Sequence, residues 1–232
     1  LDLCGWESVA AISFLSGCTV LSMSAYAVGK SMWAREKNVD TRTGTPLAIG
    51  AALGGLAGKQ LFGKLADLFA NPNTVGAVQA ACLLFITLGT LIYTLKADKI
   101  HTHQVRKVMP CIIIGTVLGL CSGFLGIGGG PINLVVLYFF FSMDTKTAAG
   151  NSLYIILFSQ TASFLNTIFT GSIPQVTLIT LILMVIGGIL GGLAGRTLNK
   201  KLTDKATRKL LVGVMIAIIC ISCYNFINYA AL

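Results

Sequence analysis

Apolar segments long enough to cross a lipid bilayer as helices recur along this chain. A spanning helix needs about 20 mostly apolar residues, because the hydrocarbon core of a bilayer is about 30 Å thick. The recurrence predicts an all-α fold: a polytopic bundle of transmembrane helices in the cell (plasma or inner) membrane, surrounded by lipid. The expected segments are residues 8–29, 45–66, 75–95, 108–125, 130–142, 149–169, 175–195 and 207–229.

The composition argues against a water-soluble domain and against a nucleic-acid partner. Charged residues make up 11% of the chain and hydrophobic residues 55%, whereas soluble domains carry about 25% charged residues. In a soluble protein the net charge of +9 would suggest nucleic acid. Here the basic residues form short clusters between apolar segments, which is typical of cytoplasmic loops in membrane proteins. We therefore expect no nucleic-acid partner.

The basic clusters also predict the topology. Three of them hold 14 of the 17 Lys and Arg residues, and the bias of such residues toward cytoplasmic loops places all three inside. Lys146 joins them, so residues 108–142 must enter the membrane and return as a hairpin. Lys59 and Lys64 fit no cytoplasmic loop. The three clusters are residues 30–42, 96–107 and 196–209.

The hairpin is expected to be broken near its middle. Its second apolar stretch, residues 132–141, is too short to cross a bilayer and follows a glycine run, Gly126-Ile-Gly-Gly-Gly130, and Pro131. In a helix Gly costs about 1 kcal/mol and Pro about 3 kcal/mol relative to Ala. The pattern predicts two short helical pieces broken at 126–131, either as a re-entrant hairpin or as two short crossings.

An internal repeat relates the two halves of the chain. Residues 50–65 and 187–202 match at ten of sixteen positions with an offset of 137. A helix with scattered polar residues precedes each block, and an apolar helix follows each. The basic clusters give the two copies opposite orientations, which is the inverted-repeat plan of many secondary transporters. The glycines of each block are spaced four apart and predict close helix packing.

The repeat predicts two domains of unequal completeness. Residues 108–232 form the second repeat, which begins with the broken hairpin. Residues 1–107 form the first repeat together with the central cytoplasmic loop. A matching hairpin should precede the first repeat, so we expect roughly 30–40 further residues, the length of 108–142, ahead of Leu1.

Two motifs in the second half resemble a known family. Ser122-Gly-Phe-Leu-Gly-Ile-Gly-Gly-Gly-Pro-Ile132 and Ala148-Ala-Gly-Asn-Ser152 are similar to the paired motifs of the TauE/SafE family of membrane permeases, the sulfite exporters. The resemblance extends over essentially the whole chain. In the first half the glycine motif is missing, and Val9-Ala-Ala-Ile-Ser13 stands as the counterpart of residues 148–152.

The resemblance implies a secondary permease for small sulfur-containing anions such as sulfite, thiosulfate or sulfonates, and not an enzyme. Alternating access would come from rocking of the two repeats around a site near the midplane. An anion channel on the same scaffold is one alternative, and a membrane scaffold without transport is another. A homodimer is compatible with the size of the chain.

Helix ends at the glycine break suit an anion. They present free backbone N–H groups with a partial positive charge, and glycine lets an oxyanion approach the backbone closely. The candidate substrate-binding residues are Ser122, Gly126, Gly128, Gly129, Gly130, Pro131, Asn151, Ser152, Gln160 and Ser13. Alternatively the glycines allow only tight helix crossing, Asn151 and Ser152 cap their helix, and Gln160 hydrogen-bonds between helices.

No cofactor or metal is expected. His101 and His103 lie in a basic loop, and the seven cysteines have no metal-binding spacing, so we interpret them as small apolar residues of the helices. The sequence has no carboxylate in the middle of an apolar segment that would relay protons. Asp144, near the hairpin, is the candidate to test for coupling.

Overall fold

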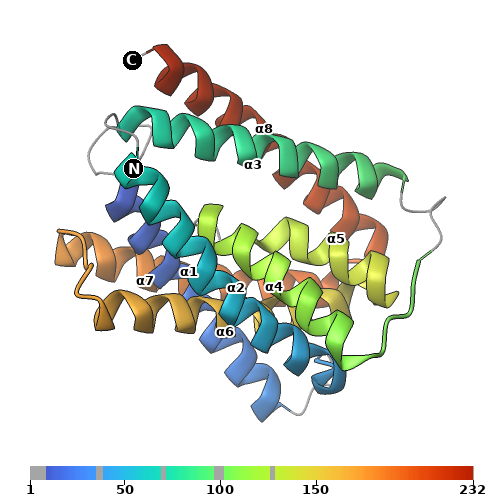
Figure 1. Ribbon diagram of the computed structural model, residues 1–232. Helices are drawn as coiled ribbons and strands as arrows, with labels where there is room; N and C mark the ends of the chain where they lie inside the picture. The colour runs from blue at the N-terminus through green and yellow to red at the C-terminus, as the bar shows by residue number, and fades with distance from the viewer. Residues whose placement is uncertain (1–8, 35–38, 69–71, 97–101, 126–128, 232) are drawn as a thin grey trace.

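The structure is a computed structural model that describes residues 9–34, 39–68, 72–96, 102–125 and 129–231. All regular secondary structure in these ranges is α-helical (Figure 1). The helices are α1 (Val9–Trp33), α2 (Thr41–Leu68), α3 (Pro72–Lys96), α4 (Val108–Leu125), α5 (Gly130–Phe141), α6 (Thr145–Phe169), α7 (Leu178–Lys201) and α8 (Asp204–Ala231). Six of them, all except α2 and α5, are long and apolar enough to cross a membrane. The predicted all-α bundle of membrane-spanning helices is confirmed.

Helices α2 and α4 approach so closely that their backbones touch. Gly50, Gly54 and Gly58 form a ridge on α2, and a Cβ added to any of them would lie within 3.0 Å of an α4 carbonyl oxygen, a separation that real Cβ atoms essentially never show. The predicted role of this ridge in close helix packing is confirmed.

The opposing surface of α4 is built in the same way. A Cβ added to Gly115, Gly119 or Gly123 would lie within 3.0 Å of a carbonyl oxygen of α2. Because both helices contribute glycines four residues apart, neither backbone is held away by side chains. This contact fixes the register of α2 against α4, and hence the position of every side chain between them.

The matching ridge on α7 is not packed in this way. A Cβ added to Gly187, Gly191 or Gly195 would meet nothing within 4 Å among the described residues. Instead α7 packs on α1 through the neighbouring face, where Gly188 and Gly192 approach α1. Within the described chain a different face of α7 therefore contacts its neighbour, and the expected packing of the Gly187 ridge against another helix stays a prediction.

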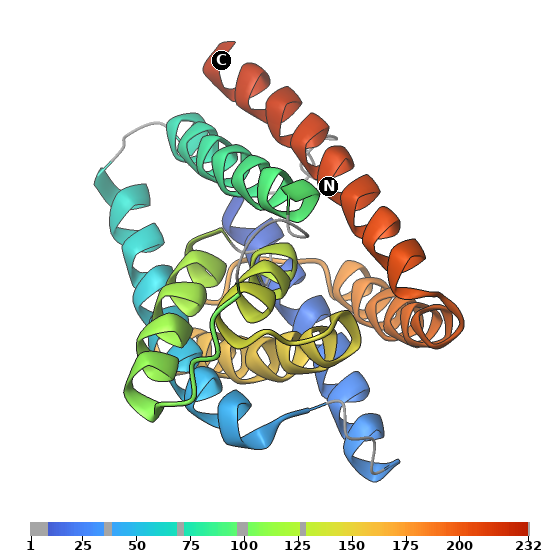
Figure 2. The same cartoon turned by 90° about the vertical axis from the view of Figure 1, so that its right-hand side faces the viewer.

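The remaining helices surround this pair. Helix α6 packs against both α1 and α2. Helices α3 and α8 pack side by side and lie across one side of the bundle, as two views show (Figures 1 and 2). Arg208 of α8 donates from Nε to the carbonyl oxygen of Thr94 on α3 over 3.1 Å, which ties the two helices together.

The start of α4 and the end of α5 lie at the same end of the molecule. The backbone N–H of His103 donates to Phe139 O over 2.7 Å, and that of Val105 donates to Phe140 O over 2.9 Å. The segment that leads into α4 is therefore bonded to the last turn of α5. This geometry supports the predicted hairpin, whereas its re-entry into a membrane and the inverted repeats remain predictions.

Candidate functional site

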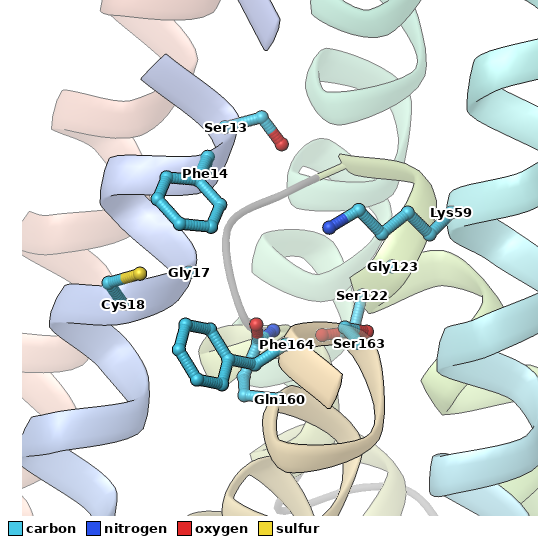
Figure 3. Close-up of a pocket in the computed structure, with 10 residues that line it drawn as sticks. All are labelled: Ser13, Phe14, Gly17, Cys18, Lys59, Ser122, Gly123, Gln160, Ser163 and Phe164. Atoms are coloured by element: carbon cyan, nitrogen blue, oxygen red, sulfur yellow. The ribbon is translucent and has the colours of Figure 1, made fainter. Parts of the chain in front are cut away.

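A lysine side chain lies in a cavity in the interior of the bundle. Lys59 extends from α2 toward the space between α1 and α6 (Figure 3), and its Nζ donates a hydrogen bond to the Thr167 hydroxyl. No ion pair of Lys59 is found among the side chains that the structure describes. Its cavity, of ≈ 30 Å³, is lined by Ser13, Phe14, Gly17, Cys18, Lys59, Ser122, Gly123, Gln160, Ser163 and Phe164. We call it the Lys59 cavity.

The Lys59 cavity lies at the depth of the predicted membrane. Cys18 and Gln160, which line it, lie within about 6 Å of the midpoints of α1 and α6, two helices that can cross a membrane, at 1.5 Å per helical residue. This is well inside the half-thickness of about 15 Å of the hydrocarbon core. A charged side chain at this depth is rare, and it usually marks a path for a substrate or an ion.

Small residues bring four helices together around the lysine. The glycine contact of α2 with α4 places Ser122 and Gly123 at the Lys59 cavity. On the other side α1 reaches α6 at Gly17, where an added Cβ would lie 3.2 Å from the Gln160 Oε1. A larger residue at Gly17 would push α1 away from the amide. Close approach of the helices therefore gives the cavity its polar lining.

Several hydroxyl groups at this level lack a partner. The Oγ atoms of Ser122, Ser159 and Ser163 are buried without a hydrogen bond to any described protein atom. An unsatisfied buried polar group costs about 1–3 kcal/mol, so such groups are normally completed by water or a ligand. The lining can thus offer hydroxyl donors beside the lysine. Phe14 and Phe164 stack at 6.3 Å between ring centroids and form an apolar wall.

The start of α5 adds a second group of polar atoms next to Ser122. Gly129 has φ 68°, a left-handed conformation that favours glycine, and precedes α5 as its N-cap. A Cβ at Gly129 would lie 3.2 Å from Asn133 Oδ1 and 3.2 Å from Ser122 Cβ. Asn133 is 1% exposed and its Oδ1 has no hydrogen-bond partner among the described atoms. Ser122, Gly129 and Asn133 therefore converge at the hairpin.

The predicted site residues separate into groups. Ser13, Ser122 and Gln160 line the Lys59 cavity together, although they come from three helices. Pro131 lines a different, mainly apolar cavity of ≈ 340 Å³ among α1, α3, α5 and α8, which Ser13 also borders.

Of the other predicted glycines, only Gly130 lies among the described residues. A Cβ added to Gly130 would have open space around it. Gly126 and Gly128 lie outside the described residues. Of the three consecutive glycines, only Gly129 is seen beside a polar side chain.

Asn151 and Ser152 lie away from the Lys59 cavity. Asn151 precedes Gln160 by nine residues, about 13 Å along α6. Its Nδ2 donates to the carbonyl oxygen of Thr147 over 2.9 Å, and its Oδ1 would lie 2.8 Å from a Cβ at Gly44 on α2. Ser152 is buried. Asn151 thus packs between α6 and α2, while its Oδ1 is buried without a hydrogen-bond partner among the described atoms, and its contact with substrate stays a prediction.

Asp144, and neither Asn151 nor Ser152, caps α6. Its Oδ1 accepts hydrogen bonds from the backbone N–H groups of Lys146 and Thr147, each over 3.0 Å, and its Oδ2 accepts one from the Thr147 hydroxyl over 2.7 Å. Burial raises the pKa of this carboxyl, but the hydrogen bonds from Thr147 and Lys146 outweigh it and hold the pKa below its ordinary 3.8. Asp144 lies at the end of α5 opposite Gly129, and its role as the N-cap of α6 explains its presence there.

Sequence reasoning missed Lys59, Asn133 and Ser163. In the sequence Lys59 stands out only because it fits no cytoplasmic loop, yet a basic residue inside a membrane segment is itself a functional indication. Asn133 could have been found as a polar residue in the first turn of a short apolar helix. Nothing in the sequence singles out Ser163, because its position depends on how α6 is rotated against α2.

One cation, several hydroxyl groups and an amide can bind a small anion. Within the described ranges no three His, Cys, Asp or Glu side chains are close enough to hold a metal ion.

Comparison with known proteins gives one match. The family model described as sulfite exporter TauE/SafE matches residues 7–221. Searches of curated proteins and of solved structures gave no significant match.

Proposed function

Because the chain belongs to the sulfite exporter TauE/SafE family, we propose that it carries its small sulfur-containing anion through the Lys59 cavity. The earlier resemblance to this family is confirmed, and with it a multi-pass membrane transporter of a small anion. TauE/SafE is a transporter family, and the proposal includes that the chain catalyses no reaction.

The observation that carries the proposal is the charge of Lys59 at membrane depth. In water a lysine is stabilised by hydration, whereas Lys59 is partly buried and loses part of that hydration without a counter-charge, which is costly. Thr167 offers a hydroxyl oxygen and no negative charge. A small anion would supply the missing charge, and its release would restore the cost. Such a site can bind an anion without holding it permanently, as transport requires.

The hydroxyl groups would hold the oxygens of the anion. A sulfite or sulfonate group presents three oxygens, so one cation alone leaves most of its acceptor sites unused. Ser122 of α4 and Ser163 of α6 have unpartnered Oγ atoms in the lining of the Lys59 cavity, and the Gln160 side chain supplies an amide. A charge-assisted bond plus neutral donors is a common arrangement for binding an oxyanion.

The small volume of the cavity favours a carrier over a channel. A space of ≈ 30 Å³ holds little more than water, so the helices must move to admit and release an anion. We place that movement between the two proposed repeats, residues 1–107 and 108–232, in keeping with rocking-type transport. An open anion channel remains the alternative, and it would show no saturation and no transport against a gradient.

The open ridge on α7 supports a homodimer. Ridges of small residues let helices of two molecules approach within a membrane, and the three glycines of this ridge contact no described residue. Lipid is the competing neighbour of this ridge. Disulfide cross-linking of Leu190→Cys in membranes distinguishes them, because only a homodimer gives a linked pair of chains.

Uptake of radiolabelled sulfite by proteoliposomes tests the proposed function. Lys59→Gln removes the charge at similar size, and Lys64→Gln is the matched control because Lys64 is exposed on the same helix. Bonds to a charged group contribute about 1.5–3 kcal/mol, so we expect Lys59→Gln to lower uptake at limiting sulfite at least about 10-fold. Lys64→Gln should transport normally.

Two results would contradict the proposal. Normal transport by correctly inserted Lys59→Gln would remove the Lys59 cavity from the route. Absence of saturable uptake by the native chain in well-sealed liposomes would argue against a carrier. Gel filtration and thermal unfolding of each variant show whether it is folded.

A further inference from the structure

We propose that the Lys59 cavity selects anions with a single negative charge. Its substrates are hydrogensulfite and organic sulfonates, and it excludes dianions such as sulfate, thiosulfate and fully ionised sulfite. The inference rests on the proposed function, because it assigns a substrate class to the same site.

The described residues give the Lys59 cavity a net charge of one positive unit. Four helices line it, and they contribute few charged or titratable groups. Among the described residues, α1 contributes the Cys18 thiol, α2 contributes Lys59, and α4 and α6 contribute only uncharged side chains. Lys64, the next basic residue of α2, is exposed. A single cation therefore faces the ligand.

The helix ends at the hairpin do not add a second charge. The N-terminus of α5 carries about half a positive charge, but the C-terminus of α4 brings about half a negative charge to the same turn. Gln79 donates from Nε2 to the carbonyl oxygen of Leu125 over 2.8 Å, which lowers the negative potential of that end only in part. The partial charges of the two helix ends largely cancel, so Lys59 sets the net charge of the site.

A monoanion and a dianion therefore meet different environments. A monoanion forms a neutral pair with Lys59, whereas a dianion leaves one negative charge in a site with an apolar wall of Phe14 and Phe164. An unpaired charge in such surroundings loses hydration that hydroxyl groups replace only in part. From the cost of one charge at membrane depth, we expect discrimination of about 100-fold.

The selection has a consequence for coupling. Near neutral pH sulfite exists as both hydrogensulfite and its dianion, and hydrogensulfite carries its own proton. Export of hydrogensulfite removes that proton with the anion, and it is released outside by ordinary ionisation. Proton movement would then need no carboxylate relay in the middle of the membrane, and the described part of the Lys59 cavity has none.

Transport by the full chain in proteoliposomes tests the selection. Initial uptake of radiolabelled sulfite at constant total concentration should fall across neutral pH in proportion to the hydrogensulfite fraction. Uptake of methanesulfonate, whose charge does not change over this range, is the control for effects of pH on the protein and should stay level. Thiosulfate and sulfate should compete with methanesulfonate about 100-fold more weakly than unlabelled methanesulfonate does.

Two variants probe the charge count directly. Lys59→Arg keeps one cation and should keep the preference for monoanions. Gln160→Lys adds a second cation to the Lys59 cavity and should increase inhibition by thiosulfate at least about 10-fold, the effect of one charge-assisted contact. If Gln160→Lys does not fold, the competition series on the native chain decides.

The outcomes separate the inference from the proposed function. Equal competition by thiosulfate and methanesulfonate, with transport still dependent on Lys59, would overturn the monoanion selection alone. Sulfite uptake that rises or stays level with pH while methanesulfonate stays level would do the same. Loss of dependence on Lys59 would instead overturn the proposed site.

Discussion

Replacing Gly54 with alanine tests the helix contact that positions the Lys59 cavity. An added Cβ would lie 2.8 Å from the Leu120 nitrogen of α4, and still closer to the Thr116 carbonyl oxygen, whereas ordinary contact begins at 3.4 Å. The backbones must therefore separate by at least about 0.6 Å, and a gap of this size forfeits a quarter to a half of the contact energy of the atoms involved.

The expected cost follows from that separation. Overpacking commonly costs about 1–3 kcal/mol, and we expect the upper end because the atoms in the way are backbone. For a chain of this size about 3 kcal/mol corresponds to a melting temperature lower by about 6–12 °C. Ser122 and Gly123 would move away from Lys59 with α4, so sulfite uptake should fall as well.

Gly63→Ala is the matched control, because it lies on the same helix and an added Cβ would meet nothing within 4 Å among the described residues. Alanine favours a helix by about 1 kcal/mol over glycine, so this variant should be as stable as the native chain or slightly more so. A thiol-reactive dye can follow unfolding in detergent because Cys111 is buried in the core. Equal melting of Gly54→Ala and Gly63→Ala would refute the packing argument.

Three further substitutions separate structure from transport. Asp144→Ala should destabilise the protein by about 1 kcal/mol at neutral pH through loss of the cap. Because the pKa of Asp144 is lowered on folding, its contribution is present above the ordinary value of 3.8 and is lost as the pH falls below it. A melting difference between variant and native chain that stays constant into acid would contradict this. Gly129→Leu should abolish sulfite uptake in a chain that still inserts, because a side chain at φ 68° would run into Ser122; full uptake would remove the glycine turn from the site. Asn151→Ala should lower thermal stability and leave the half-saturation concentration for sulfite unchanged, since Asn151 faces Gly44; a raised half-saturation concentration would place it on the transport route.

The helices could be predicted from the sequence because membrane spans are set by length and apolar character. The break expected at 126–131 agrees with the end of α4 at Leu125 and the start of α5 at Gly130. The start of α6 was predicted four residues late, at 149 instead of Thr145, because hydropathy does not register the polar first turn that Asp144 caps.

The site was predictable only in part, because residues from separate helices meet according to helix rotation and register. Ser13, Ser122 and Gln160 were identified as polar residues in apolar segments, and the structure brings them together. Lys59 was not chosen, since its direction depends on the glycine contact between α2 and α4. The same glycine spacing on α7 faces no described helix, so a glycine motif alone does not identify the helix that packs against it.

Protection of Cys18 from alkylation tests the central claim most directly. Cys18 lines the Lys59 cavity, and the helix movement proposed to admit an anion would also expose its thiol to a reagent. Cys111 is buried elsewhere in the core and serves as an internal control. Saturating methanesulfonate should slow the reaction of Cys18 with N-ethylmaleimide, read by peptide mass spectrometry, and leave Cys111 unaffected. Lys59→Gln should lose the protection. Equal labelling of Cys18 with and without methanesulfonate, in protein shown to transport it, would contradict the assignment of this cavity as the substrate site.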